Sequence, residues 1–447
     1  MDEDIIEKAE AYFARRDCHL AGRLGFGIHG IVFAIEDNDH LLTHSLTPTG
    51  IGTTGALCWG VNHPDSHERA FGLDLMRAVA IALVTLSHVL LVPLWVLLRR
   101  HTAWPVMAGY FGVEIFFVLS GFLIGGILIR DFSKSATGGT LTRFWCRRWL
   151  RTLPLFYLFV VINLAIDHAR GGPVAGWWWN AFFLQNFTSA GGPFFRESWS
   201  LAVEEWFYLL APALIFAGLK MRLPLKRAAL AVALGGIAGA TVWRLHVVGS
   251  GHLKGFDAVH TVVTMRLDAC MFGVFAAWWN HYAPESWNAW RRGKLGIGLL
   301  CLCGAGAMYQ LLPLGSSFAG GTHLLTLTSL GAMLCLPSLA ALRTPRSKLA
   351  QAVTLVSKWS YAMYLVNLPI FIWLEREAGR ALEEPLTAAV AAASGLMFTV
   401  IASAALHYLY ETPILRWRDR RLNVSGEVGA SPGRLPAEPR APEPAHV

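Results

Sequence analysis

Two ionisable side chains, Arg77 and His88, lie in one long apolar segment at residues 73–98. In a helix, their spacing of 11 residues puts them about 20° from the same face and about 16 Å apart along the axis. Histidine gains and loses a proton near neutral pH, so we expect His88 to act as an acid or a base. The alternative is a histidine that only hydrogen-bonds neighbouring helices.

A carboxylate, Glu114, lies in the next apolar segment, at residues 107–129, about 10 Å from its outer end. We expect His88 at a similar depth. A carboxylate that accepts a hydrogen bond from an imidazole orients the ring, so we predict that Glu114 pairs with His88 as a second catalytic group. Two pairs of small residues, 120–121 and 125–126, predict close packing against another helix.

Arginines crowd the start of the third apolar segment. Arg143, Arg147 and Arg151 form a helical stripe at i, i+4 and i+8, with Arg148 beside it. Guanidinium groups bind phosphates through paired hydrogen bonds. We therefore expect an anionic donor, such as a nucleotide-linked thioester, to be bound by Arg77, Arg147, Arg148 and Arg151. The alternative is that these arginines only fix the membrane topology.

The fourth apolar segment opens with polar side chains. Ser200, Glu204 and Tyr208 share one helical face, and Glu205 adjoins it. Hydroxyl and carboxylate groups near a membrane surface suit the hydroxyls of a sugar, so we expect these four residues on the acceptor side. Ser200 could instead cap the helix. Further along the chain, we expect 266–268, which holds an Arg and an Asp, to be structural.

The composition is that of a membrane protein. Hydrophobic residues make up 54% of the 447 residues and charged residues 15%, against about 25% charged residues in soluble proteins. We predict an all-α, polytopic fold with about ten transmembrane helices, since only helices satisfy their own backbone in lipid. The apolar segments lie at 73–98, 107–129, 149–168, 203–219, 226–248, 261–280, 294–312, 320–342, 355–375 and 386–409.

The basic residues are distributed unequally between the connecting loops. If the N-terminus is cytoplasmic, the inner loops hold 20 Lys and Arg and the outer loops 7. The positive-inside rule therefore places both termini in the cytoplasm. The same distribution explains the net charge of +8 without a nucleic-acid partner.

The chain is predicted to have three parts. Residues 1–70 are polar and contain G-x-G-x-x-G-x-V at 25–32, the pattern of a kinase glycine-rich loop, but the catalytic remainder of a kinase is missing. Residues 71–413 form the transmembrane part. Residues 414–447 are rich in Pro, Ala and Glu, which predicts a disordered cytoplasmic tail. The seven cysteines are scattered and show no metal-binding spacing, so we expect no metal site.

The longest outer connection, at about 169–202, is rich in tryptophan. Trp177, Trp178, Trp179 and Trp199 lie in it. Tryptophan favours the membrane interface, which is one interpretation; a platform for a sugar ring is the other.

Several ordered motifs resemble the acyltransferase-3 family of integral membrane acyltransferases. They cover residues 72–413 and comprise R-x10-H from Arg77 to His88, GVEIFFVLSGFLI, RRWLR, SWSLAVEEWFY, RLDACMFG, SYAMYLVNLPI and YLYETP. Two positions depart from the family pattern. Glu114 stands where Asp is frequent, which keeps the charge, and Asn367 stands where His is common, which removes any proton transfer there.

The resemblance implies an O-acyltransferase of a bacterial inner membrane. It would move an acyl group, commonly acetyl from cytoplasmic acetyl-CoA, to a hydroxyl of an extracytoplasmic carbohydrate or glycolipid. His88 would be the catalytic histidine, and the arginines would bind the donor. Acyl-CoA is then a substrate, and no cofactor is expected. Because ten spans with buried charges also suit a proton-coupled transporter, that function is the alternative.

Overall fold

The computed structural model describes residues 22–27, 30–37, 40–44, 70–98, 104–169, 176–189, 191–192, 194–251, 256, 259–311, 318–378, 382 and 384–422. The chain divides into two units, Met1–Ser66 and His67–Val447. Each unit is described by itself.

The first unit contains an antiparallel sheet of three strands in the order β1 (Gly22–Gly27), β2 (Gly30–Asp37) and β3 (His40–His44). In the register of β1 and β2, Gly27 lies opposite Gly30. The glycine-rich pattern at 25–32 thus falls on two paired strands, except for residues 28–29, which lie outside the described residues. These strands add a small β element to the predicted all-α chain.

The second unit is helical. Within its described residues, ten helices of at least 16 residues follow the ten predicted segments in order: α2 (Phe71–Leu98), α3 (Trp104–Lys134), α4 (Gly138–Ala169), α6 (Ser198–Lys220), α7 (Leu225–Gly249), α8 (Leu267–Tyr282), α10 (Arg291–Leu311), α11 (Phe318–Leu339), α12 (Lys348–Ala378) and α13 (Pro385–Leu406). Eight of them are long and apolar enough to cross a membrane; α8 and α12 are the two others. The unit is therefore an all-α, polytopic membrane fold.

Shorter helices complete the unit. They are α5 (Trp177–Ala181), the 3-10 helix η1 (Val263–Met265), α9 (Pro284–Asn288), the π-helix η3 (His407–Glu411) and α14 (Thr412–Arg421). Several predicted boundaries differ from the observed ones; α4, for example, begins at Gly138 although its segment was predicted from 149. The sixth segment was predicted from 261, but α8 begins at Leu267 because the preceding backbone forms η1. The tail was predicted from 414, but α14 remains helical to Arg421; residues 423–447 lie outside the described part.

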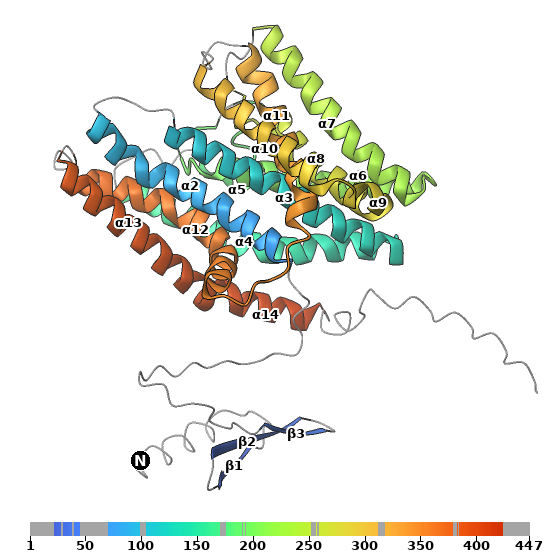
Figure 1. Cartoon of the computed structure of the whole chain (residues 1–447), viewed down its shortest axis with the longest axis vertical. Coiled ribbons are helices and arrows are strands. Elements are labelled where there is room, and N and C mark those ends of the chain that lie inside the picture. The colour runs from blue at the N-terminus through green and yellow to red at the C-terminus, as the bar shows by residue number, and fades with distance from the viewer. Residues whose placement is uncertain are drawn as a thin grey trace, which may run out of the picture. The chain divides into compact units, whose positions relative to one another are not determined.

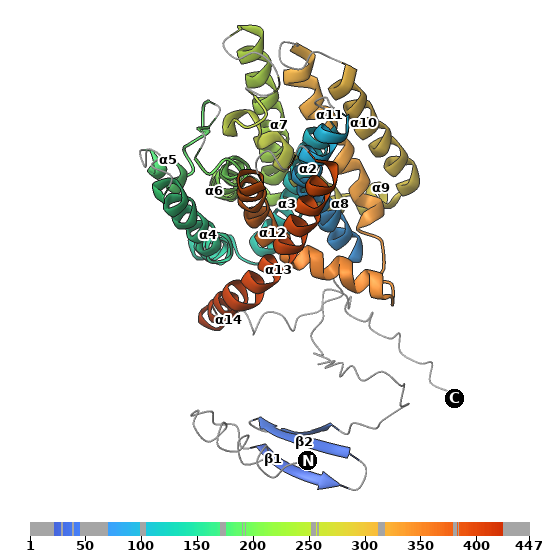
Figure 2. The same ribbon diagram turned by 90° about the vertical axis from the view of Figure 1, so that its left-hand side faces the viewer.

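Helices α2, α3 and α12 lie near the middle of the bundle, with α4, α7, α10 and α13 around them (Figures 1 and 2). Glycines allow α3 and α8 to approach closely. A Cβ at Gly121 would lie 1.9 Å from the Cys270 carbonyl oxygen, and one at Gly125 would lie 2.9 Å from the Ala277 Cβ. Both small-residue pairs were predicted to pack, but a Cβ at Gly126 would meet nothing within 4 Å.

The outer helices expose apolar side chains. In the most apolar windows of α10 and α13, only 17% of the residues are buried. Val390 on α13 and Leu300 on α10 are 60% and 72% exposed. Helices that are apolar on their exposed faces are typical of contact with lipid, so the polar side chains of the unit gather inside the bundle.

Candidate active site

Two cavities lie inside the helical unit. The first, of 310 Å³, is lined by Arg77 near the start of α2. The second, of 550 Å³, is lined by His88 on the same helix. Val113 and Tyr364 line both cavities. We call the first the arginine cavity and the second the histidine cavity.

Three of the four predicted donor residues line the arginine cavity: Arg77, Arg148 and Arg151. Arg148 and Arg151 lie in the third and fourth turns of α4, because this helix begins at Gly138, before the apolar segment starts. Arg147 does not line the cavity, because adjacent residues of a helix point in different directions and it is Arg148 that faces the cavity. The carbonyl oxygen of Arg147 accepts a hydrogen bond from Arg418 on α14. The predicted stripe therefore reaches the cavity only in part.

Neighbouring side chains fix Arg77 in place. Arg77 Nη1 donates to Ser357 Oγ on α12 at 3.2 Å, and Asp74 Oδ1 lies 3.5 Å from the same nitrogen. Ser357 Oγ also donates to Asp74 Oδ1 at 2.6 Å. These contacts tie α2 to α12 and hold the guanidinium group at the wall of the arginine cavity.

Arg148 and Arg151 differ in their partners. Arg148 Nη2 donates to the Tyr208 hydroxyl, and the Arg148 guanidinium carbon lies 4.0 Å from the centre of the Tyr208 ring. Arg151 is exposed and makes no hydrogen bond or ion pair with any residue that the structure describes. Its guanidinium group is therefore available for a bound anion.

Two of the four predicted acceptor residues, Ser200 and Glu204, line the arginine cavity, and none of the four lines the histidine cavity. The Tyr208 hydroxyl donates to Glu204 Oε2 at 2.9 Å and lies 2.7 Å from Ser120 Oγ, while Glu205 Oε1 accepts from Thr152 Oγ1 at 2.7 Å. Tyr208 also contacts Arg148, so these groups are partners of the arginine. Spacing along α6 showed a shared face but not which cavity that face lines.

Ser200 lies at the partition between the cavities. Its Oγ is 2.5 Å from the Tyr364 hydroxyl, which also donates to the Glu197 carbonyl oxygen at 3.1 Å. Helix α6 begins at Ser198, so Ser200 is not its cap residue. Tyr364, held by these bonds, lines both the arginine cavity and the histidine cavity.

His88 reaches the histidine cavity through close packing of α2 and α3. A Cβ at Gly109 would lie 2.7 Å from Ser87 Oγ, and one at Gly112 would lie 2.6 Å from the Ala80 carbonyl oxygen. His88 Nδ1 makes a short hydrogen bond with Asn367 Oδ1 on α12. The predicted partner, Glu114, does not contact His88.

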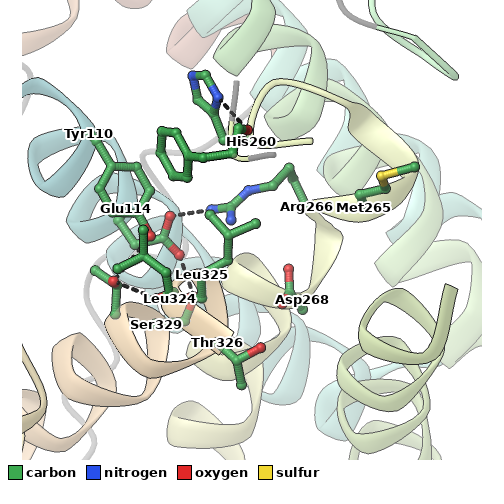
Figure 3. Close-up of polar contacts among 12 residues, drawn as sticks. Tyr110, Glu114, His260, Met265, Arg266, Asp268, Leu324, Leu325, Thr326 and Ser329 are labelled. Atoms are coloured by element: carbon green, nitrogen blue, oxygen red, sulfur yellow. Dashed lines mark hydrogen bonds and ion pairs between the residues drawn. The ribbon is translucent and has the colours of Figure 1, made fainter. Parts of the chain in front are cut away.

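Glu114 instead faces α8 and α11. Its carboxylate accepts hydrogen bonds from Arg266 Nη2 and from Ser329 Oγ, and Figure 3 shows these two groups meeting it from different sides. Asp268 pairs with Arg244 on α7 at 2.9 Å. The predicted pairing of Glu114 with His88 is therefore wrong, because equal depth in the membrane does not fix the face of a helix. The structural role expected for Arg266 and Asp268 agrees with these buried pairs.

The histidine cavity contains Glu197 and His260, which the sequence analysis did not select, and Trp199, which it did. These side chains line it together with His88. Glu197 is 8% exposed, and burial raises the pKa of its carboxyl group to about 7. Trp177, Trp178 and Trp179 are exposed and do not line the cavity. Of the tryptophans considered, only Trp199 is thus placed to contact a ligand beside His88.

Asn367 was noted in the sequence only as a departure from the family pattern, and its contact with His88 was not predicted. It is a fully buried polar side chain in the apolar run SYAMYLVNLPI. A polar residue inside an apolar helix needs a partner, which here is His88. Among the described residues, no group of three His, Cys, Asp or Glu side chains is placed to hold a metal ion.

The sequence matches the model of a family described as an acyltransferase domain over residues 71–408. It is similar to the peptidoglycan O-acetyltransferase OatA of Listeria monocytogenes, with 29% identity over 215 residues, 44% of this chain and 32% of that protein. It is also similar to the O-acetyltransferase OatA of Staphylococcus aureus, with 31% identity over 159 residues, 32% of this chain and 24% of that protein. No solved structure matches the chain.

The class defined by the helical fold and the buried polar site is that of integral membrane acyltransferases. The chain belongs to the acyltransferase-3 family, which confirms the resemblance predicted from its motifs. The chain spans less than a third of the length of these two relatives. Family membership favours an acyltransferase over the transporter alternative.

Proposed function

We propose that this protein transfers an acyl group, acetyl in the first instance, from acyl-CoA to a hydroxyl of a cell-wall carbohydrate or glycolipid. The observation that carries the proposal is the pair of adjoining cavities, with arginines in one and His88 in the other. Relatives that act as O-acetyltransferases, including one named for peptidoglycan, support the reaction and the class of acceptor.

The arginine cavity is the proposed donor site. CoA carries phosphates, and the guanidinium group of Arg151 lines this cavity and makes no hydrogen bond or ion pair with the described residues. The arginines lie on the side that the loop charges assign to the cytoplasm. In this account the donor binds from the cytoplasm of a bacterial cell, and both chain termini lie on that side of the inner membrane.

The thioester would pass Val113 and Tyr364 to reach His88. His88 then takes the proton of an acceptor hydroxyl while the hydroxyl oxygen attacks the thioester carbonyl carbon. The carbon–sulfur bond breaks, and the proton on His88 passes to the leaving CoA sulfur. A second route has His88 attack the thioester first and carry the acyl group to the acceptor. In both routes His88 is the reacting side chain.

Sealed proteoliposomes with the protein in a known orientation test this proposal. The donor is labelled acetyl-CoA, and the acceptor probe is a soluble N-acetylglucosamine oligosaccharide. We expect labelled ester only when donor and acceptor are on opposite sides of the membrane, with the donor on the side of the arginine cavity. Ester formation only with both on one side would contradict the transmembrane arrangement.

A further inference from the structure

The side-chain amide of Asn367 has only one orientation that satisfies its neighbours. Asn367 Nδ2 donates to the carbonyl oxygens of Met363 and Tyr364, at 2.7 Å and 2.8 Å. Carbonyl oxygens only accept hydrogen bonds, so the nitrogen of the amide must face them. Turning the amide over would bury its oxygen against two other oxygens, with no donor between them. Oδ1 is therefore the atom that faces His88.

This orientation determines the tautomer of His88. Asn367 Oδ1 can only accept, so the hydrogen bond to His88 requires a proton on Nδ1. A neutral imidazole carries one ring proton, which leaves Nε2 with a lone pair. The hydrogen bond of the His88 ring to a described residue is made through Nδ1, and His88 lines the histidine cavity, so Nε2 is left for a bound ligand.

We infer that Asn367 is a positioning residue that holds His88 with its proton on Nδ1 and its basic Nε2 available to the acceptor hydroxyl. The inference rests on the function proposed above. When Nε2 takes the proton, the bond from Nδ1 to Asn367 persists, so the ring does not need to turn during transfer. The same Nε2 then returns the proton to the departing sulfur. Asn367 itself exchanges no proton.

Kinetics of two variants test this role. Asn367→Leu removes the acceptor, and we expect kcat to fall about 10- to 100-fold, because the ring is no longer held in the reactive orientation. The KM for acetyl-CoA should stay within about twofold, since the donor site is separate. Asn367→Asp keeps an acceptor but adds a charge that favours the protonated ring. It should retain more activity than Asn367→Leu, with the acidic limb of its pH profile moved to higher pH.

Asn163→Leu is the matched control. Asn163 lies on α4 and donates to the carbonyl oxygen four residues earlier, at 2.8 Å, but it does not contact His88. We expect wild-type kinetics and a wild-type pH profile for this variant. An Asn367→Leu variant that behaves like Asn163→Leu would overturn the inference.

A spectroscopic measurement on the wild-type protein decides the inference separately from activity. In protein labelled with nitrogen-15 at histidine and reconstituted in lipid, the signal lost in His88→Gln identifies His88. At pH 8 we expect a protonated Nδ1 and an unprotonated Nε2. Finding the proton on Nε2 would overturn the role of Asn367 and would leave the proposed acyl transfer untouched. Finding the expected tautomer in a protein that transfers no acyl group would contradict only the proposed function.

Discussion

The carboxylate of Glu114 is paired with the guanidinium group of Arg266, and both side chains are only 1% exposed. Glu114 lies on α3 and Arg266 directly precedes α8, while Ser329 of α11 donates to the same carboxylate. A charge inside the bundle is stable only with such partners. Glu114 therefore connects α3 to the start of α8 and to α11, whereas His88 is bonded to Asn367 on α12.

We predict that Glu114→Ala destabilises the protein by about 3–5 kcal/mol, because it leaves Arg266 buried without its counter-charge. Thermal unfolding of the detergent-solubilised protein measures the loss. The double variant Glu114→Leu with Arg266→Met removes both charges and should be more stable than Glu114→Ala. If the single variant unfolds at the wild-type temperature, the pair does not hold the helices together.

Helix contact at Gly121 gives a second stability prediction. A Cβ at this position would lie 1.9 Å from the Cys270 carbonyl oxygen, so Gly121→Ala must separate α3 from α8 and should cost about 1–3 kcal/mol. Gly126→Ala is the control, because its Cβ meets nothing within 4 Å and alanine favours a helix. Equal unfolding temperatures for the two variants would contradict the close approach of the helices.

Arg151→Ala should weaken donor binding. The loss of charge-assisted hydrogen bonds to phosphate predicts a KM for acetyl-CoA raised about 10- to 100-fold, with little change in kcat. Acetyl-pantetheine lacks the nucleotide phosphates, so its KM should be the same in the variant and in the wild type. Arg143→Ala, outside the arginine cavity, serves as the control. An equal change with both donors would show that Arg151 does not bind phosphate.

Glu197 predicts a dependence of stability on pH. Burial raises its pKa from 4.5 to about 7 in the folded protein, so between these values the unfolded chain ionises while the folded chain stays protonated. The folded state therefore loses stability as the pH rises from 4.5 to 7. Glu197→Gln removes this loss, and its unfolding temperature relative to the wild type should be higher at pH 8 than at pH 5. A difference that does not vary with pH would contradict the raised pKa.

The sequence predicted the helices well because crossing a membrane requires long apolar runs. All ten segments correspond to helices in the described part of the chain. The sixth was predicted to begin too early, since the residues before α8 form η1 and are held by loop contacts such as Val263 N to the Asn186 carbonyl oxygen. Periodicity contains no information about such contacts.

The site was predicted in its residue types but not in its pairings. Arg77 and His88 lie on one helix, as predicted, and line separate cavities, which the sequence analysis did not predict. The partners of Glu114 and His88 depend on how α2, α3, α8, α11 and α12 are rotated about their axes, which a single sequence does not determine. Ser200, Glu204 and Tyr208 share a face as predicted, yet Tyr208 contacts Arg148 because α4 packs beside α6.

The most direct test of the account is release of free CoA from labelled acetyl-CoA by the purified protein, wild type beside His88→Ala. We predict acceptor-dependent release by the wild type, and a rate lower by about 100-fold or more in His88→Ala, which should unfold at a similar temperature. Acetyl transfer by a folded His88→Ala protein at the wild-type rate would contradict the central role of His88.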